Sequence, residues 1–113
     1  MIQIYHNPRC GKSRSALKIL TDQGAAHEVK LYLKEPPTFD ELKTVVGKLG
    51  MKPLDLIRKG EKIFKEQFKG TERTDEEWIE VMVANPILIE RPIVIRGDQA
   101  VVARPPEKTL ELI

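Results

Sequence analysis

Residues 2–14 read IQIYHNPRCGKSR, and this stretch decides the fold because it joins a short strand, a turn and the start of a helix. Isoleucines alternate with a polar residue at its beginning, which is typical of a strand. Pro8 has no N–H for a sheet ladder and disfavours helix at the residue before it. We therefore predict a strand over residues 2–6 and a helix that begins near Cys10.

The chain beyond this stretch predicts a second strand. Apolar residues recur at helical spacing through Leu20, and Gly24 is a good helix terminator. Residues 28–33 alternate apolar and polar side chains, as a strand does. The order strand, turn, helix, strand indicates a right-handed βαβ unit.

Residues 38–88 predict a block of helices. Thr38 and Thr74 are each followed by glutamate three residues later, which is the capping-box pattern of a helix start. A short helix is expected at 54–57, and short helix with loop at 58–73.

The C-terminal part returns to strands. Residues 92–95 and 100–103 flank a Gly-Asp turn and predict a β-hairpin, and a last helix is expected over 107–112. The complete order is βαβ, helical block, ββα. It is similar to that of a thioredoxin-like α/β domain with a mixed four-stranded sheet and a helical insertion at about 38–88, in one domain over 1–113.

Composition excludes several classes of protein. Hydrophobic residues make up 41% and charged residues 32% of the 113 residues, which is typical of a globular chain and not of a disordered one. A net charge of +2 gives no reason to expect nucleic acid as a partner. No apolar run is long enough for a membrane span, and no signal peptide is visible at the N-terminus. One cysteine and two histidines supply no metal-ligand set, and a single free thiol fits the cytoplasm.

The turn around Cys10 predicts an activated thiol. The first N–H groups of a helix lack helical partners and, with the helix dipole, stabilise a thiolate or an oxyanion. Lys12 and Arg14 add positive charge, Ser13 can turn its hydroxyl toward the sulfur, and His6 comes from the strand end. We predict that the pKa of Cys10 lies below its usual value of about 8.5.

The run 5–14, YHNPRCGKSR, resembles the active-site loop of the glutaredoxin-dependent arsenate reductase family. The resemblance extends over essentially the whole chain through the blocks 56–59, 85–94 and 103–107. Several matching blocks in the same order are a far more specific signal than a lone Cys-x-x-Ser.

The resemblance implies an arsenate reductase that takes part in arsenical resistance. In that family the cysteine, here Cys10, forms a covalent adduct with arsenate, glutathione attacks it, glutaredoxin removes the glutathione, and arsenite leaves. His6 and Ser13 are then expected to assist the thiol, and Pro92 is expected to be cis. We expect no bound cofactor, glutathione as co-substrate, glutaredoxin as protein partner and a monomeric chain.

The resemblance also implies which residues hold the oxyanion. By position these are Arg58, Arg91 and Arg104, with Gly11 and Arg14 at the helix start. Guanidinium groups suit the role, because they bind tetrahedral oxyanions through paired, charge-assisted hydrogen bonds and offset the repulsion between thiolate and substrate.

Other functions remain open on the sequence alone. Known arsenate reductases often carry Ala and Thr where this chain has Arg9 and Lys12. The Pro-Arg pair before the cysteine looks closer to a subgroup called arsenate-reductase-related, whose members need not all reduce arsenate. Similar chains act as redox-responsive transcription regulators that bind RNA polymerase, but these commonly carry Cys-x-x-Cys, and Ser13 takes the second position here. A general glutathione-linked thiol oxidoreductase is the third possibility, since a Cys-x-x-Ser turn permits monothiol chemistry.

Overall fold

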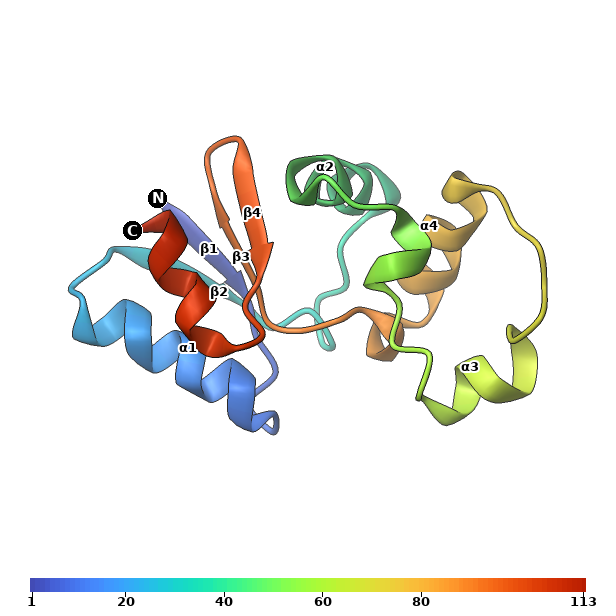
Figure 1. Ribbon diagram of the computed structural model, residues 1–113, viewed down its shortest axis with the longest axis horizontal. Helices are drawn as coiled ribbons and strands as arrows, with labels where there is room; N and C mark the ends of the chain where they lie inside the picture. Colours follow the sequence, from blue (N-terminus) through green and yellow to red (C-terminus); the bar gives the residue numbers. More distant parts are fainter. The chain divides into compact units, whose positions relative to one another are not determined.

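The computed structural model describes residues 1–113 and divides into two compact units (Figure 1). The first unit combines residues 1–35 with 91–113, and the second comprises residues 36–90.

The first unit is built on a four-stranded sheet in the order β2-β1-β3-β4. The β1 and β2 strands are parallel, whereas β3 pairs antiparallel with both β1 and β4, so the mixed sheet expected from the sequence is confirmed. The elements of this unit are β1 (Ile2–Tyr5), α1 (Gly11–Asp22), β2 (His27–Lys30), β3 (Ile93–Arg96), β4 (Gln99–Val102) and the 3₁₀ helix η3 (Pro106–Leu112).

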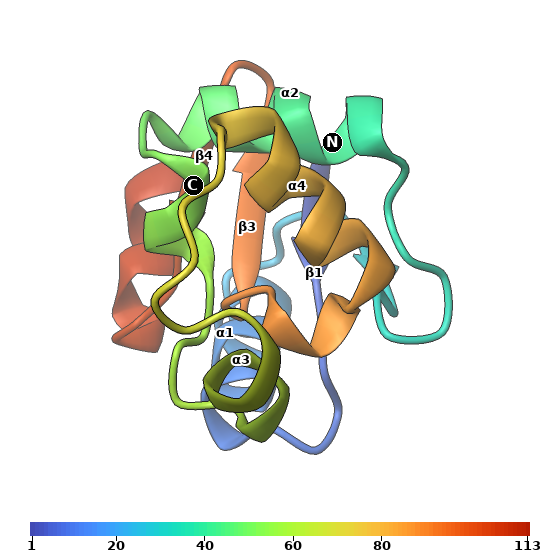
Figure 2. The same cartoon turned by 90° about the vertical axis from the view of Figure 1, so that its right-hand side faces the viewer.

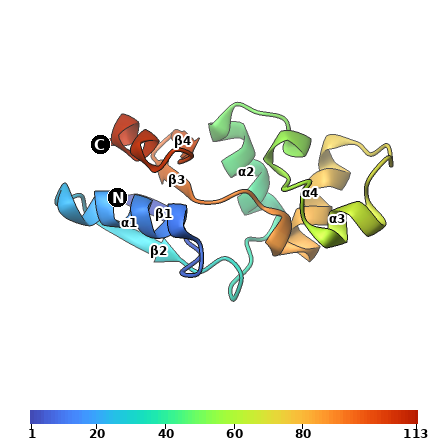
Figure 3. The ribbon, with the colours of Figure 1, turned by 60° about the horizontal axis from the view of Figure 1, so that its bottom comes forward.

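One face of this sheet carries the hydrophobic core with α1 and η3, which lie side by side in Figures 1 and 3. Ala16 and Leu20 of α1 are fully buried and stand one helical turn apart, so a single stripe of the helix faces the sheet. This core comprises Ile2, Ile4, Ala16, Leu20, Val94, Ala103 and Leu112. It fixes the start of α1 at the end of β1, where the thiol lies.

The second strand is shorter than predicted, because β2 ends at Lys30 and does not run to residue 33. The backbone N–H groups of Lys34 and Glu35 both donate to the carbonyl of Leu31, which closes a turn where a strand would need ladder bonds. Tyr32 within this turn is fully buried, and its ring stacks on that of Tyr5 at a centroid distance of 6.2 Å. Burial of one aromatic ring outweighs the alternating pattern here.

Two capped helices belong to the second unit, and both are labelled in Figure 2. Thr38 and Thr74 each accept the N–H of the glutamate three residues on, and that glutamate accepts the threonine N–H in return, so both predicted capping boxes are confirmed. The elements are α2 (Phe39–Leu49), η1 (Pro53–Leu56), α3 (Lys62–Gln67), α4 (Asp75–Ala84) and η2 (Pro86–Leu88).

Two prolines follow cis peptide bonds in the first unit. The Arg91–Pro92 bond is cis, which confirms the expectation, and the Arg104–Pro105 bond is also cis, which the sequence did not predict. The predicted hairpin turn is present, with Gly97 at φ 58°, a value that favours glycine. The N- and C-termini of the chain lie near each other in this unit (Figures 1 and 3). None of the helices has both the length and the apolar character that crossing a membrane requires.

Candidate functional site

Cys10 is the N-cap residue of α1, at the end of the loop that leaves β1. Its N–H donates to the carbonyl of Asn7 at 3.0 Å, and its own carbonyl accepts the N–H of Arg14 at 3.0 Å. The cysteine is free and half-buried, so the sulfur is both anchored and accessible.

The surroundings of Cys10 favour a thiolate. Burial raises the pKa of the Cys10 thiol, but hydrogen bonds from the backbone N–H of Ser13, the Arg91 side chain and the backbone N–H of Lys12, with the charge of Arg91, bring it below its ordinary value. No conventional side-chain cap bond closes the helix at Cys10, so the N–H groups remain directed at the sulfur. The predicted direction of the pKa is confirmed, and Arg91 is an unanticipated cause.

The Ser13 hydroxyl does not act on the sulfur as the sequence suggested. Its Oγ accepts the backbone N–H of Asn7 at 3.0 Å and lies 2.6 Å from Nδ1 of His6. Burial, and secondarily the charge of Arg14, lower the pKa of His6 and so favour the neutral ring, whose Nδ1 can accept the hydroxyl proton. His6 and Ser13 therefore shape the loop. Of these two residues, only Ser13 contacts the thiol, and it does so through its backbone N–H.

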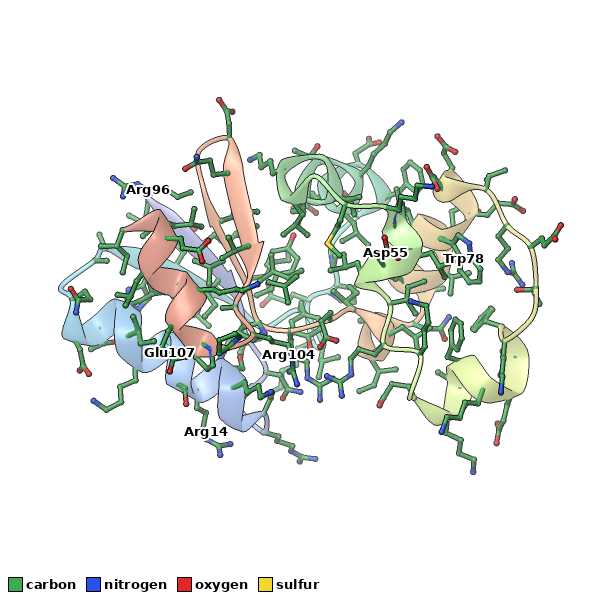
Figure 4. All side chains as sticks on the ribbon, viewed as in Figure 1. Arg14, Asp55, Trp78, Arg96, Arg104 and Glu107 are labelled. Carbon is green, nitrogen blue, oxygen red and sulfur yellow. The ribbon has the colours of Figure 1, made fainter.

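The side chains of Arg14 and Asn7 each make a hydrogen bond to the backbone of the loop. Arg14 projects from the first turn of α1 (Figure 4), and its Nη1 donates to the carbonyl of Pro8 at 2.9 Å. The Asn7 side chain accepts the N–H of Arg9 at 3.0 Å, although Asn7 itself is almost fully buried. Asn7 is a site residue that the sequence reasoning missed, and its signal was the Asn-Pro pair, which favours a side-chain turn.

Two of the three predicted oxyanion-binding arginines meet in the first unit. The Arg91 side chain hydrogen-bonds Cys10, and Nη1 of Arg104 donates to the carbonyl of Arg91 at 3.0 Å. The backbone adds a bond from Ala103 N–H to the carbonyl of Pro92 at 2.9 Å. Arg104, labelled in Figure 4, thus supports the segment that presents Arg91 to the sulfur.

Arg58, the third arginine, belongs to the second unit, where two carboxylates accompany it. Its Nη1 lies 3.1 Å from Oε1 of Glu90, and its Nε lies 4.0 Å from Oε2 of Glu61. Its Nε is buried and has no hydrogen-bond partner.

The first turn of α1 differs in charge from those of α2 and α4. The α2 and α4 helices begin with acidic side chains, which complement the positive end of the helix dipole. The first turn of α1 has no acidic residue and carries Lys12 and Arg14. The positive end of the α1 dipole is therefore available to stabilise a thiolate or an external anion.

Gly11 opens α1 beside the thiol. A Cβ built there would meet only Nη2 of Arg14 at 3.7 Å, and φ of Gly11 is not positive, so neither space nor backbone conformation requires glycine. Its predicted part in oxyanion binding would have to come from its backbone N–H.

A cavity of about 400 Å³ adjoins the loop, with walls that are mostly apolar. Its lining includes two cationic side chains, Arg9 and Lys34. The lining comprises His6, Asn7, Pro8, Arg9, Leu31, Leu33 and Lys34. The structure contains no group of three His, Cys, Asp or Glu residues placed to hold a metal ion.

Known proteins resemble this chain over nearly its whole length. The sequence model of the ArsC family matches residues 5–112. Uncharacterized protein YfgD of Escherichia coli strain K12 is 41% identical over 99% of this chain and 96% of its own length. An arsenate reductase of Neisseria meningitidis serogroup B is 41% identical over 94% of this chain and 92% of its own.

The fold is also that of a solved relative. The structure of an arsenate reductase from Vibrio cholerae matches with a TM-score of 0.95 at 40% identity, covering 99% of this chain and 97% of that one. The likeness confirms the thioredoxin-like α/β class predicted from the order of elements.

Proposed function

The chain belongs to the ArsC family, and from that membership we propose that it is an oxidoreductase that reduces arsenate to arsenite with Cys10 as nucleophile. One observation carries the proposal: the thiol whose pKa is lowered accepts a hydrogen bond from the Arg91 guanidinium at a helix N-terminus free of acidic residues. A thiolate and a cation are thereby paired where a tetrahedral anion must approach.

In the first step the Cys10 sulfur attacks arsenic. A sulfur–arsenic bond forms, and one arsenate oxygen takes up protons and leaves as water, so arsenic remains As(V). Arg91 would offset the repulsion between thiolate and oxyanion, and its hydrogen bond to the sulfur supports this role. The resemblance assigns the remaining oxygens to Arg104 and Arg58, whose guanidinium groups each offer several donors.

The second and third steps need external thiols, since Cys10 is the single cysteine of the chain. Glutathione displaces a second oxygen as water and forms its own sulfur–arsenic bond. Glutaredoxin then attacks the glutathione sulfur, a disulfide forms between them, and the electron pair of the broken bond reduces As(V) to As(III). Water displaces Cys10, arsenite leaves and the thiol is restored.

The cavity beside the loop supports glutathione as the first external thiol. Its walls are apolar, and Arg9 and Lys34 are cations that match the two carboxylates of that tripeptide. The cavity is lined by the residues just before Cys10, so a bound thiol would approach along the nucleophile loop.

The deciding experiment is arsenate-dependent NADPH oxidation, coupled through glutathione, glutathione reductase and glutaredoxin. We expect turnover in the natural chain and none with Cys10→Ser, because a hydroxyl at that position is not ionised near neutral pH. Circular dichroism of the variant checks that it folds.

Activity retained in Cys10→Ser would overturn the covalent mechanism. If the folded natural chain, with a reactive thiol, shows no arsenate turnover, the arsenate proposal fails and the chain belongs with the arsenate-reductase-related proteins. Reduction of a glutathione mixed disulfide without arsenate would then identify a general thiol oxidoreductase.

A further inference from the structure

Arg58 and Glu90 stand on two segments that the backbone ties together. The N–H of Arg58 donates to the carbonyl of Leu88 at 2.8 Å, and the N–H of Glu90 donates to the carbonyl of Leu56 at 2.9 Å. Ile57 and Ile89 form an antiparallel bridge between these bonds, and both are buried. The two side chains therefore project from a short ribbon with little freedom to move apart.

The pair itself is well placed to fix a guanidinium. Oε1 of Glu90 accepts from Nη1 of Arg58 at 3.1 Å, and the side chains are 28% and 23% exposed, so water screens the contact only in part. Glu90 engages only one terminal nitrogen of the guanidinium, Nη1. Arginine loses considerable rotamer freedom when it is held in one geometry, and a partner that already holds it removes that cost from ligand binding.

Glu61 offers an internal comparison on the same arginine. It is also 28% exposed, but its closest oxygen lies 4.0 Å from Nε, which is too far for a hydrogen bond. Glu61 and Glu90 thus contribute the same charge at similar exposure, and only Glu90 fixes the direction of the guanidinium.

We propose that Glu90 is a positioning residue that orients the Arg58 guanidinium for the oxyanion, and that Glu61 is not. This inference rests on the proposed function in so far as the oxyanion is arsenate. Glu90 directly precedes Arg91 in the chain, so one backbone segment carries both the residue that orients Arg58 and the arginine that contacts the thiol.

The first test follows Arg58 itself and needs no activity. The heteronuclear NOE of the Arg58 Nε–Hε group, measured by ¹⁵N NMR on the full chain, should fall in Glu90→Ala and stay unchanged in Glu61→Ala. Glu90→Gln should keep most of it, because an amide oxygen still accepts the hydrogen bond. Equal Arg58 order in the natural chain and Glu90→Ala would overturn the inference.

The second test is a double-mutant cycle on the KM for arsenate. We expect Glu90→Ala to raise this KM about tenfold, Glu61→Ala to change it less than about twofold, and the KM for glutathione to stay the same in both. In the Arg58→Ala background the Glu90 substitution should have no further effect.

Three results of the cycle would contradict the inference. An equal loss with and without Arg58 would show that Glu90 acts on the structure in general. A lower KM in Glu90→Ala or Glu90→Gln would show that the carboxylate competes with the anion. A KM equal to that of the natural chain would show that orientation has no effect. If the natural chain does not turn over arsenate while Arg58 order still depends on Glu90, the proposed function fails and the orienting role stands.

Discussion

At Cys10, opposing influences act on one thiol. Burial favours the neutral form, while the N–H groups of Ser13 and Lys12 and the guanidinium of Arg91 favour the thiolate, and the second group prevails. The backbone part of this balance was predictable, because a residue at a helix start meets free N–H groups whatever follows. The Arg91 contact was not predictable in detail, because it depends on how a distant segment lies against the loop.

Replacing Arg91 tests the charged part of that balance. Arg91→Ala removes a hydrogen bond and a positive charge from the thiolate, so the pKa of Cys10 rises toward its ordinary value. The pH profile of alkylation by iodoacetamide should move to higher pH, and the rate near pH 7 should fall several-fold because less thiolate is present.

Arg9→Ala is the matched control for this variant. Arg9 is an exposed arginine next to Cys10 in sequence, and it does not contribute to the shift of the thiol pKa. The alkylation profile should be the same as that of the natural chain. An unchanged profile in Arg91→Ala would show that the helix N-terminus alone activates the thiol.

At the scale of elements, the sequence predicted best where the signal is local. Both capping boxes and the hairpin at Gly97 appear as expected, because each is decided within four residues. The β2 strand was overextended, because burial of Tyr32 depends on the rest of the fold. The second cis bond, before Pro105, has no local signature either.

Thr74 allows the contribution of one cap to be measured. Its hydroxyl accepts the N–H of Glu77, and hydrogen bonds from the Thr74 backbone and side chain lower the pKa of that carboxyl. Thr74→Ala should lower the free energy of unfolding by about 1 kcal/mol, whereas Thr74→Ser should change it little. Urea unfolding followed by circular dichroism measures both, and equal stability of the two variants would contradict the role of the cap.

At the scale of the whole molecule, the unit that holds the thiol is discontinuous in sequence. It is assembled from Met1–Glu35 and Arg91–Ile113, with the second unit between them in the chain. The later segment supplies the β3 strand that pairs with β1, and it supplies Val94, Ala103 and Leu112 of the core. The sequence indicated this order of elements, but it could not predict which side chains Arg58 contacts in the second unit.

A chain truncated after Glu90 tests this dependence. Without β3, β4 and η3, the β1 strand keeps only its parallel partner, and Val94, Ala103 and Leu112 are missing from the core. We expect its β1 amides to exchange with solvent at nearly free rates and Cys10 to react like an ordinary thiol. A peptide of residues 91–113 added to the truncated chain should restore protection in part. Protected β1 amides in the truncated chain alone would refute this expectation.

The same discontinuity sets an order of events during synthesis. A ribosome releases the nucleophile loop first, then the entire helical unit, and only afterwards the strand that completes the sheet. For most of translation Cys10 therefore belongs to a nascent chain that has neither β3 nor Arg91. The Arg91 contribution to the thiol therefore arises only after the helical unit has been made, so we expect a chain stalled before Arg91 to carry a less reactive cysteine.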